Sequence, residues 1–118
     1  MEAAAQACDG KKQELLQQLA ELLVEEQRDR GTFQSVPHYS VLEQAARALG
    51  QEVSRAAQAR AMAEVAATAK ATAACPTCGQ QHSVAVQKRR VTSVDGPVEL
   101  LEPVAHCPAC RRDFFPSA

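Results

Sequence analysis

Four cysteines in the C-terminal part of the chain form two Cys-x-x-Cys pairs, Cys75-Pro76-Thr77-Cys78 and Cys107-Pro108-Ala109-Cys110. Four thiolates at such spacing are typical ligands of one tetrahedral zinc ion. Pro76 and Pro108 fix the backbone after the first cysteine of each pair, which favours a tight turn that directs two sulfur atoms at one ion. Because four protein ligands leave no position for water, the pattern predicts one structural Zn²⁺ held by Cys75, Cys78, Cys107 and Cys110.

Other chemistries of the cysteine pairs remain open from the sequence alone. Iron in a rubredoxin-like site uses the same four thiolates. Cys-Pro-Thr-Cys resembles thiol-exchange motifs, although these normally lie in a βαβ context that this sequence lacks. Paired disulfides would require an oxidising compartment. The fifth cysteine, Cys8, is expected to be a spare thiol near the N-terminus, and the three histidines, His38, His82 and His106, are not expected to bind the ion, although His106 could donate to a sulfur.

The segment between the two cysteine pairs has the pattern of a β-hairpin. Residues 82–93 alternate in part and carry β-branched side chains, Val94-Asp95-Gly96-Pro97 is a turn signal, and residues 98–106 fit a return strand. We call each cysteine pair with its turn a knuckle. The order knuckle, strand, turn, strand, knuckle predicts a zinc ribbon over residues 75–118.

The two knuckles differ in the residue that follows them. Gly79 permits a left-handed backbone after the first knuckle, whereas Arg111 takes the equivalent position after the second. The ribbon contains only two phenylalanines, so burial of apolar surface alone is too small to stabilise it. Structural zinc contributes roughly 10–16 kcal/mol in small finger peptides, and we expect it to hold this ribbon together.

The residues before the ribbon predict two helices over 11–74, preceded by a frayed segment at 1–10. Residues 11–30 place leucines on one stripe, and Gly31 is a plausible stop. A second helix is expected to start at Ser40, in a capping box with Glu43, and to run to about residue 73. Its narrow seam of mostly small residues comprises Val41, Ala45, Leu49, Val53, Ala56 and Ala63.

The seam allows two arrangements, a helical hairpin within one chain or a coiled-coil homodimer through residues 40–73. Together with the ribbon, either arrangement predicts a small α+β fold. The 118 residues contain no Trp, one Tyr and three Phe, so a large globular core is not expected. No apolar run is long enough for a membrane span, and the N-terminus is unlike a secretory signal, which favours the cytoplasm and reduced cysteines.

Basic residues gather at two places in the ribbon, although the formal net charge of the chain is only -1. Lys88, Arg89 and Arg90 lie on the first expected strand, and Arg111 and Arg112 follow the second knuckle. Together they could form a face that contacts DNA phosphates. A solvated edge strand protected by charges is the plainer interpretation.

The stretch from Cys75 to Pro116 resembles the N-terminal zinc ribbon of the ISKra-type transposases of bacterial insertion sequences. The resemblance rests on the two Cys-x-x-Cys pairs, on Arg90, Thr92, Gly96 and Val98 around the turn, and on the Phe114-Phe115-Pro116 tail. The preceding helix is similar to the family's upstream helix, with less specificity.

The resemblance implies a non-catalytic module that binds DNA or helps to assemble a transposase complex, because the catalytic domain of the family would follow the FFP segment. We therefore expect a truncated transposase-like chain without enzymatic activity. Two alternatives stay open: a stand-alone protein-interaction module that dimerises through the long helix, and a fragment without function. No small-molecule substrate is expected.

Overall fold

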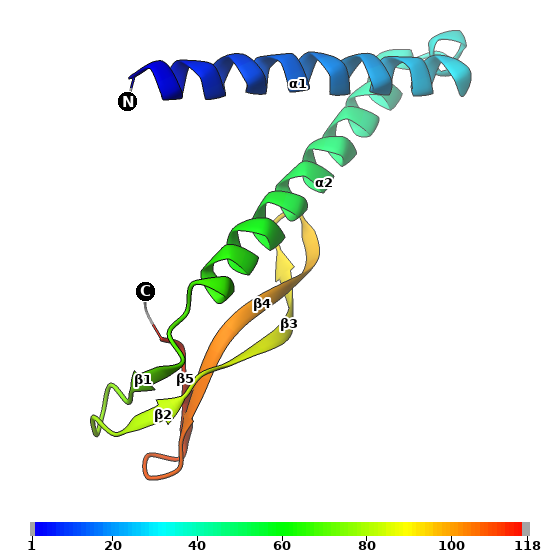
Figure 1. The fold of residues 1–118 in the computed structure, drawn as a ribbon. Coiled ribbons are helices and arrows are strands. Elements are labelled where there is room, and N and C mark those ends of the chain that lie inside the picture. Colours follow the sequence, from blue (N-terminus) through cyan, green and yellow to red (C-terminus); the bar gives the residue numbers. More distant parts are fainter. Residues whose placement is uncertain (1, 117–118) are drawn as a thin grey trace. The chain divides into compact units, whose positions relative to one another are not determined.

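A computed structural model describes residues 2–116 of the chain (Figure 1). The predicted α+β class is confirmed: two long helices precede a small antiparallel β region. Two compact units, Met1–Leu49 and Gly50–Ala118, divide the chain within the second helix. The elements are α1 (Glu2–Asp29), the 3₁₀ turn η1 (Thr32–Gln34), α2 (His38–Ala67), β1 (Thr72–Ala74), β2 (Gln81–Ser83), β3 (Ala85–Ser93), β4 (Gly96–Cys107) and β5 (Arg112–Phe114).

Helix α1 starts at Glu2, so the prediction of a frayed segment at 1–10 is wrong for the described residues 2–10. The alanines of this segment are strong helix formers, and they extend the helix ahead of the leucine stripe. The helix ends at Asp29, and Gly31, the predicted stop, turns the chain with a left-handed φ of 77°; its amide donates to the Arg28 carbonyl at 3.0 Å. Thr32 Oγ1 donates to the buried Gln27 Oε1 at 2.7 Å and closes this end.

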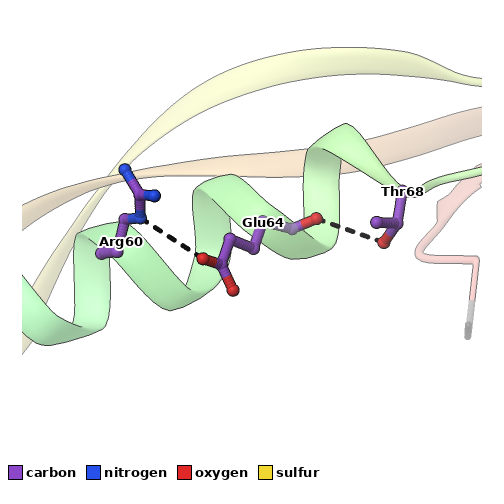
Figure 2. A network of polar contacts seen from close by, with 3 residues as sticks. All are labelled: Arg60, Glu64 and Thr68. Atoms are coloured by element: carbon purple, nitrogen blue, oxygen red, sulfur yellow. Dashed lines mark hydrogen bonds and ion pairs between the residues drawn. The ribbon is translucent and has the colours of Figure 1, made fainter.

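Helix α2 starts at His38, so Ser40 lies inside its first turn and the predicted capping box is wrong. The helix ends at Ala67 rather than near residue 73. Both the amide and the hydroxyl of Thr68 donate to the Glu64 carbonyl at 3.1 Å, and the Glu64 side chain pairs with Arg60 at 3.3 Å (Figure 2). Neither helix in residues 2–116 combines the length and the apolar character needed to cross a membrane.

The residues after α2 form a strand instead of helix. Thr72–Ala74 pairs antiparallel with Gln81–Ser83, so β1 and β2 flank the first knuckle. The sequence had indicated one continuous strand over 82–93, but Val84 divides it into β2 and β3, and its amide donates to the Ala71 carbonyl at 2.9 Å beside the β1–β2 pair. In β1, hydrogen bonding to β2 thus overrides the helical preference of Ala73 and Ala74.

Strands β3 and β4 form the long hairpin, with a register from Ala85↔Val104 to Ser93↔Gly96. The loop is the two-residue Val94-Asp95, and Gly96 has a φ of 110°. The turn signal in the sequence is therefore confirmed, although β4 starts earlier than predicted. The short strand β5, which the sequence analysis missed, pairs with Ala105–Cys107 at the far end of β4.

Within the second unit, α2 runs alongside this hairpin (Figure 1). Ser54 Oγ donates to Asp95 Oδ2 at 2.5 Å, and Arg55 Nη1 donates to the Asp95 carbonyl at 2.7 Å. These bonds attach the hairpin loop to the helix. From Gly50 onward, the residues of α2 that are partly or fully buried recur every three or four positions, as one face of a helix requires: Gln51, Ser54, Arg55, Gln58, Ala59, Met62, Ala63 and Ala66.

One member of the predicted dimer seam, Ala63, lies on this partly buried face, whereas Val41 and Val53 are exposed. Dimerisation through residues 40–73 stays a prediction.

Gly96→Ala should weaken the attachment between loop and helix. A side chain disfavours the φ of 110° at this position, and its Cβ would lie 3.1 Å from Arg55 Nη1. We expect a loss of about 1–2 kcal/mol in the free energy of unfolding, measured by denaturant titration with metal in excess. Gly50→Ala is the matched control, because nothing lies within 4 Å of its Cβ and it sits in α2, where alanine should stabilise by ~1 kcal/mol. Equal effects of the two substitutions would contradict the assigned strain.

Candidate metal centre

The first knuckle is a turn closed by main-chain hydrogen bonds between β1 and β2. The Cys75 amide donates to the Gln80 carbonyl at 2.8 Å, and the Gly79 amide donates to the Cys75 carbonyl at 2.9 Å. Gly79 has the left-handed φ of 78° that its place in the sequence indicated. The turn thereby brings Cys75 and Cys78 to the same side of the loop.

The second knuckle lies between β4 and β5 and follows the same backbone course. Arg111 adopts a φ of 54° and is the one non-glycine residue with positive φ in the described residues. It occupies the position that Gly79 has in the first knuckle. The difference in residue type noted in the sequence is therefore not a difference in conformation. A left-handed arginine costs roughly 1–2 kcal/mol, which the pairing of β5 and the sulfur cluster must offset.

The two knuckles bring all four sulfur atoms together. The Sγ atoms of the four predicted ligands lie within 4.8 Å of one another. Two of the sulfur contacts join different knuckles: Cys75 Sγ to Cys110 Sγ is 3.8 Å, and Cys78 Sγ to Cys107 Sγ is 3.5 Å. A tetrahedron with metal–sulfur bonds of about 2.3 Å requires sulfur–sulfur distances of about 3.8 Å. The cluster therefore has the size and the donor set of a four-thiolate metal site.

The sulfur cluster is also the centre of the small core of this region. Cys107 and Cys75 are 0% and 2% exposed, and they pack with the buried Ala105 and Phe114. Cys78 is exposed and Cys110 is partly buried. Two of the cysteines thus belong to the core, Cys110 packs against it and Cys78 is exposed, so a bound ion would join the apolar interior to the surface turns.

The crowded thiols hold their protons unequally. The amides of Cys78 and Thr77 bond to the Cys75 sulfur and lower the pKa of Cys75 to about 6. The bond to Cys75, followed by burial, raises the pKa of Cys110 to about 12. The Gln80 amide lowers the pKa of Cys78, but the Cys107 thiol and burial together raise it above its usual value. Four adjacent thiolates repel one another, so a cation is needed for all four to be deprotonated.

The remaining metal-capable residues lie outside the cluster. His106 Nδ1 lies 2.8 Å from Asp113 Oδ1 across the β4–β5 pair, so this side chain has a partner other than sulfur. His82 packs edge-on against Phe114, and its buried Nε2 has no hydrogen-bond partner within the described residues. Cys8 is exposed in α1. None of the five cysteines forms a disulfide.

A contact that the sequence analysis missed ties the two knuckles together. Arg112 Nη2 donates to Thr77 Oγ1 at 2.5 Å. Arg112 follows the second cysteine pair and Thr77 lies inside the first, so this exposed bond links the two knuckles at the surface. The sequence contains no signal for it, because the two residues meet only when β5 has paired with β4.

The basic residues proposed to bind DNA do not form one uniform face. Neighbours along a strand point to opposite sides of a sheet, so Lys88 and Arg90 share one side of β3 and Arg89 has the other. Arg89 Nη1 lies 3.3 Å from Oε1 of Glu102, whose side chain is largely buried. Lys88 Nζ lies 3.7 Å from Glu99 Oε1, and both of these side chains are well exposed. Arg90 and Arg111 form no ion pair within residues 2–116.

Comparisons with protein-family models, with curated proteins and with solved structures found no match to this chain. The resemblance to a transposase zinc ribbon therefore stays a prediction.

Cys107→Ser should abolish binding of one equivalent of metal, because it removes a buried thiolate from a closed set of four. Cys8→Ser should leave the metal content unchanged, since Cys8 lies in α1, outside the sulfur cluster. Metal analysis by mass spectrometry after gel filtration measures both. Full retention of metal by the Cys107 variant would show that the four sulfurs are not the ligands.

Proposed function

We propose that this protein is a binding module stabilised by one structural zinc ion. The observation that carries the proposal is the convergence of four sulfur atoms within 4.8 Å from two separate turns. Tetrahedral sites with four sulfur ligands are characteristic of zinc and of iron. Zinc is preferred here because it has no redox chemistry and is the usual ion of ribbons built on two Cys-x-x-Cys turns.

The geometry argues against a thiol-exchange centre. In a redox Cys-x-x-Cys, the two sulfurs of one motif react with each other. Here sulfur contacts of 3.8 and 3.5 Å join one knuckle to the other, and all four sulfurs belong to one cluster. Four thiolates also occupy all four coordination positions of a tetrahedral zinc ion. Zinc would therefore stabilise the fold and would not bind and activate a water molecule. We accordingly propose no catalytic role for the site.

Removal of zinc should unfold the ribbon while leaving α1 intact. The cysteines make up much of the small core around Ala105 and Phe114, so little apolar burial would remain to hold β4 against β5. After treatment with a strong chelator, amide hydrogens of β3, β4 and β5 should exchange rapidly, and those of α1 should keep their protection. Added zinc should reverse the change. Unchanged protection in the strands, with no zinc released, would contradict the structural role.

We also propose that the ribbon contacts DNA through Lys88, Arg90 and Arg111. Lys88 and Arg90 share one side of β3, and Lys88 pairs with an exposed Glu99, an ion pair that contributes little stability in water. Arg89 and Arg112 instead have partners within the fold, Glu102 and Thr77. The proposal thus narrows the five basic residues of the sequence analysis to three, with Arg89 and Arg112 holding the structure.

The DNA proposal is tested by electrophoretic mobility shift over a range of salt concentrations. Lys88→Gln with Arg90→Gln should weaken binding and lower the slope of log affinity against log salt by about two, one for each lost phosphate contact. Lys11→Gln with Lys12→Gln removes the same charge from α1 and should leave the slope unchanged. Equal losses in both double variants would indicate a general charge effect, and no binding by the wild type at low salt would refute the proposal.

Descent from the N-terminal part of an ISKra-type transposase is a further proposal. It is supported by the hairpin between the two knuckles and by its turn at Val94-Asp95, which lies between the motif residues Thr92 and Gly96. A protein partner held by the ribbon is the alternative that a negative DNA experiment would favour.

A further inference from the structure

Helix α1 carries an apolar stripe that the described residues leave largely uncovered. Leu15, Leu16 and Leu22 are 49%, 50% and 60% exposed, and Leu19 and Leu23 are only partly buried. At 3.6 residues per turn these five leucines share one face of the helix. A stable helix in water normally covers such a stripe, so a partner surface is expected here.

The leucines of the stripe are spaced symmetrically about Leu19, whereas the charged residues at its two ends are opposite in sign. Leu15 and Leu23 lie at equal distances from Leu19, and so do Leu16 and Leu22. Lys12 and Glu26 each lie seven residues from Leu19, two helical turns away, and so belong to the same face. The face is therefore symmetric in its apolar residues and opposite in its end charges.

This symmetry indicates which partner covers the leucine stripe. We propose that α1 pairs with α1 of a second copy of this chain, antiparallel, about a two-fold axis at Leu19. A two-fold axis joins a surface to itself, so each residue meets its mirror position. Leu15 then meets Leu23, Leu16 meets Leu22, and Lys12 of each copy meets Glu26 of the other. A parallel pair would instead place lysine against lysine and glutamate against glutamate.

The present partners of the two charges do not prevent this pairing. Within the same chain, Lys12 Nζ lies 3.9 Å from Asp9 Oδ1, and Glu26 Oε1 lies 2.6 Å from Arg30 Nη2. Both pairs are well exposed, and exposed pairs along a helix contribute little. The surface belongs to the first unit alone, and it differs both from the ribbon and from the α2 seam that the sequence had suggested for a dimer.

Charge reversal tests the pairing in the full-length, zinc-loaded protein by sedimentation equilibrium. The wild type should change from monomer to dimer as its concentration rises. Lys12→Glu and Glu26→Lys should each weaken the dimer at least about tenfold, because each places like charges together twice. The double variant should restore wild-type association. Lys70→Glu, an equal charge change on a residue outside α1, is the control. A wild type that stays monomeric, or single variants that associate normally, would overturn the proposal.

Cross-linking determines the direction of the two helices. Cys8 and Arg30 are also mirror positions about Leu19, so Arg30→Cys creates two thiols that meet in the antiparallel dimer. Along one chain these two positions lie about 33 Å apart, too far for a disulfide. Mild oxidation with zinc in excess should link Cys8 of one copy to the introduced thiol of the other, and peptide mass spectrometry identifies this link. Links from Cys8 to Cys8 would show a parallel pair and refute the arrangement.

Discussion

The convergence of four sulfur atoms is the constraint on which the ribbon depends. The core around them contains few bulky side chains, with Ala105 and Phe114 as the buried apolar partners of Cys75 and Cys107. Such a core cannot offset the entropy of ordering five strands by burial alone. A cation that binds all four thiolates couples the two knuckles, and through them it couples β1 and β2 to β4 and β5.

The long β3–β4 hairpin connects the sulfur cluster to helix α2. β4 belongs to both structures, since it pairs with β3 along most of its length and with β5 at its cysteine end. At the other end, Ser54 and Arg55 of α2 bond to Asp95 in the loop. The hairpin is thus held at its two ends by different interactions, packing in the sulfur cluster at one end and hydrogen bonds to α2 at the other. The exposed basic residues of β3 lie between these two anchors.

The two units differ in how they use apolar side chains. In the second unit, one face of α2 is partly buried beside its own hairpin. In the first unit, the leucines of α1 are the largest apolar side chains of the helix and remain largely exposed. The same helical periodicity therefore has two outcomes, packing within the chain and a surface suited to a second copy. Periodicity alone identifies an apolar face but not its partner.

The sequence by itself determined the clustering of the four cysteines, the hairpin with its turn after Ser93, and the existence of two helices, because cysteine spacing, turn chemistry and helical periodicity are local signals. Only the tertiary structure decided that Thr72–Ala74 is a strand, that Arg111 takes the left-handed backbone of Gly79, and that Arg112 bonds to Thr77. Each of these depends on a strand or knuckle distant in the chain, whose pairing energy outweighs local preference. The pairing of Arg89 with Glu102 likewise required the strand register.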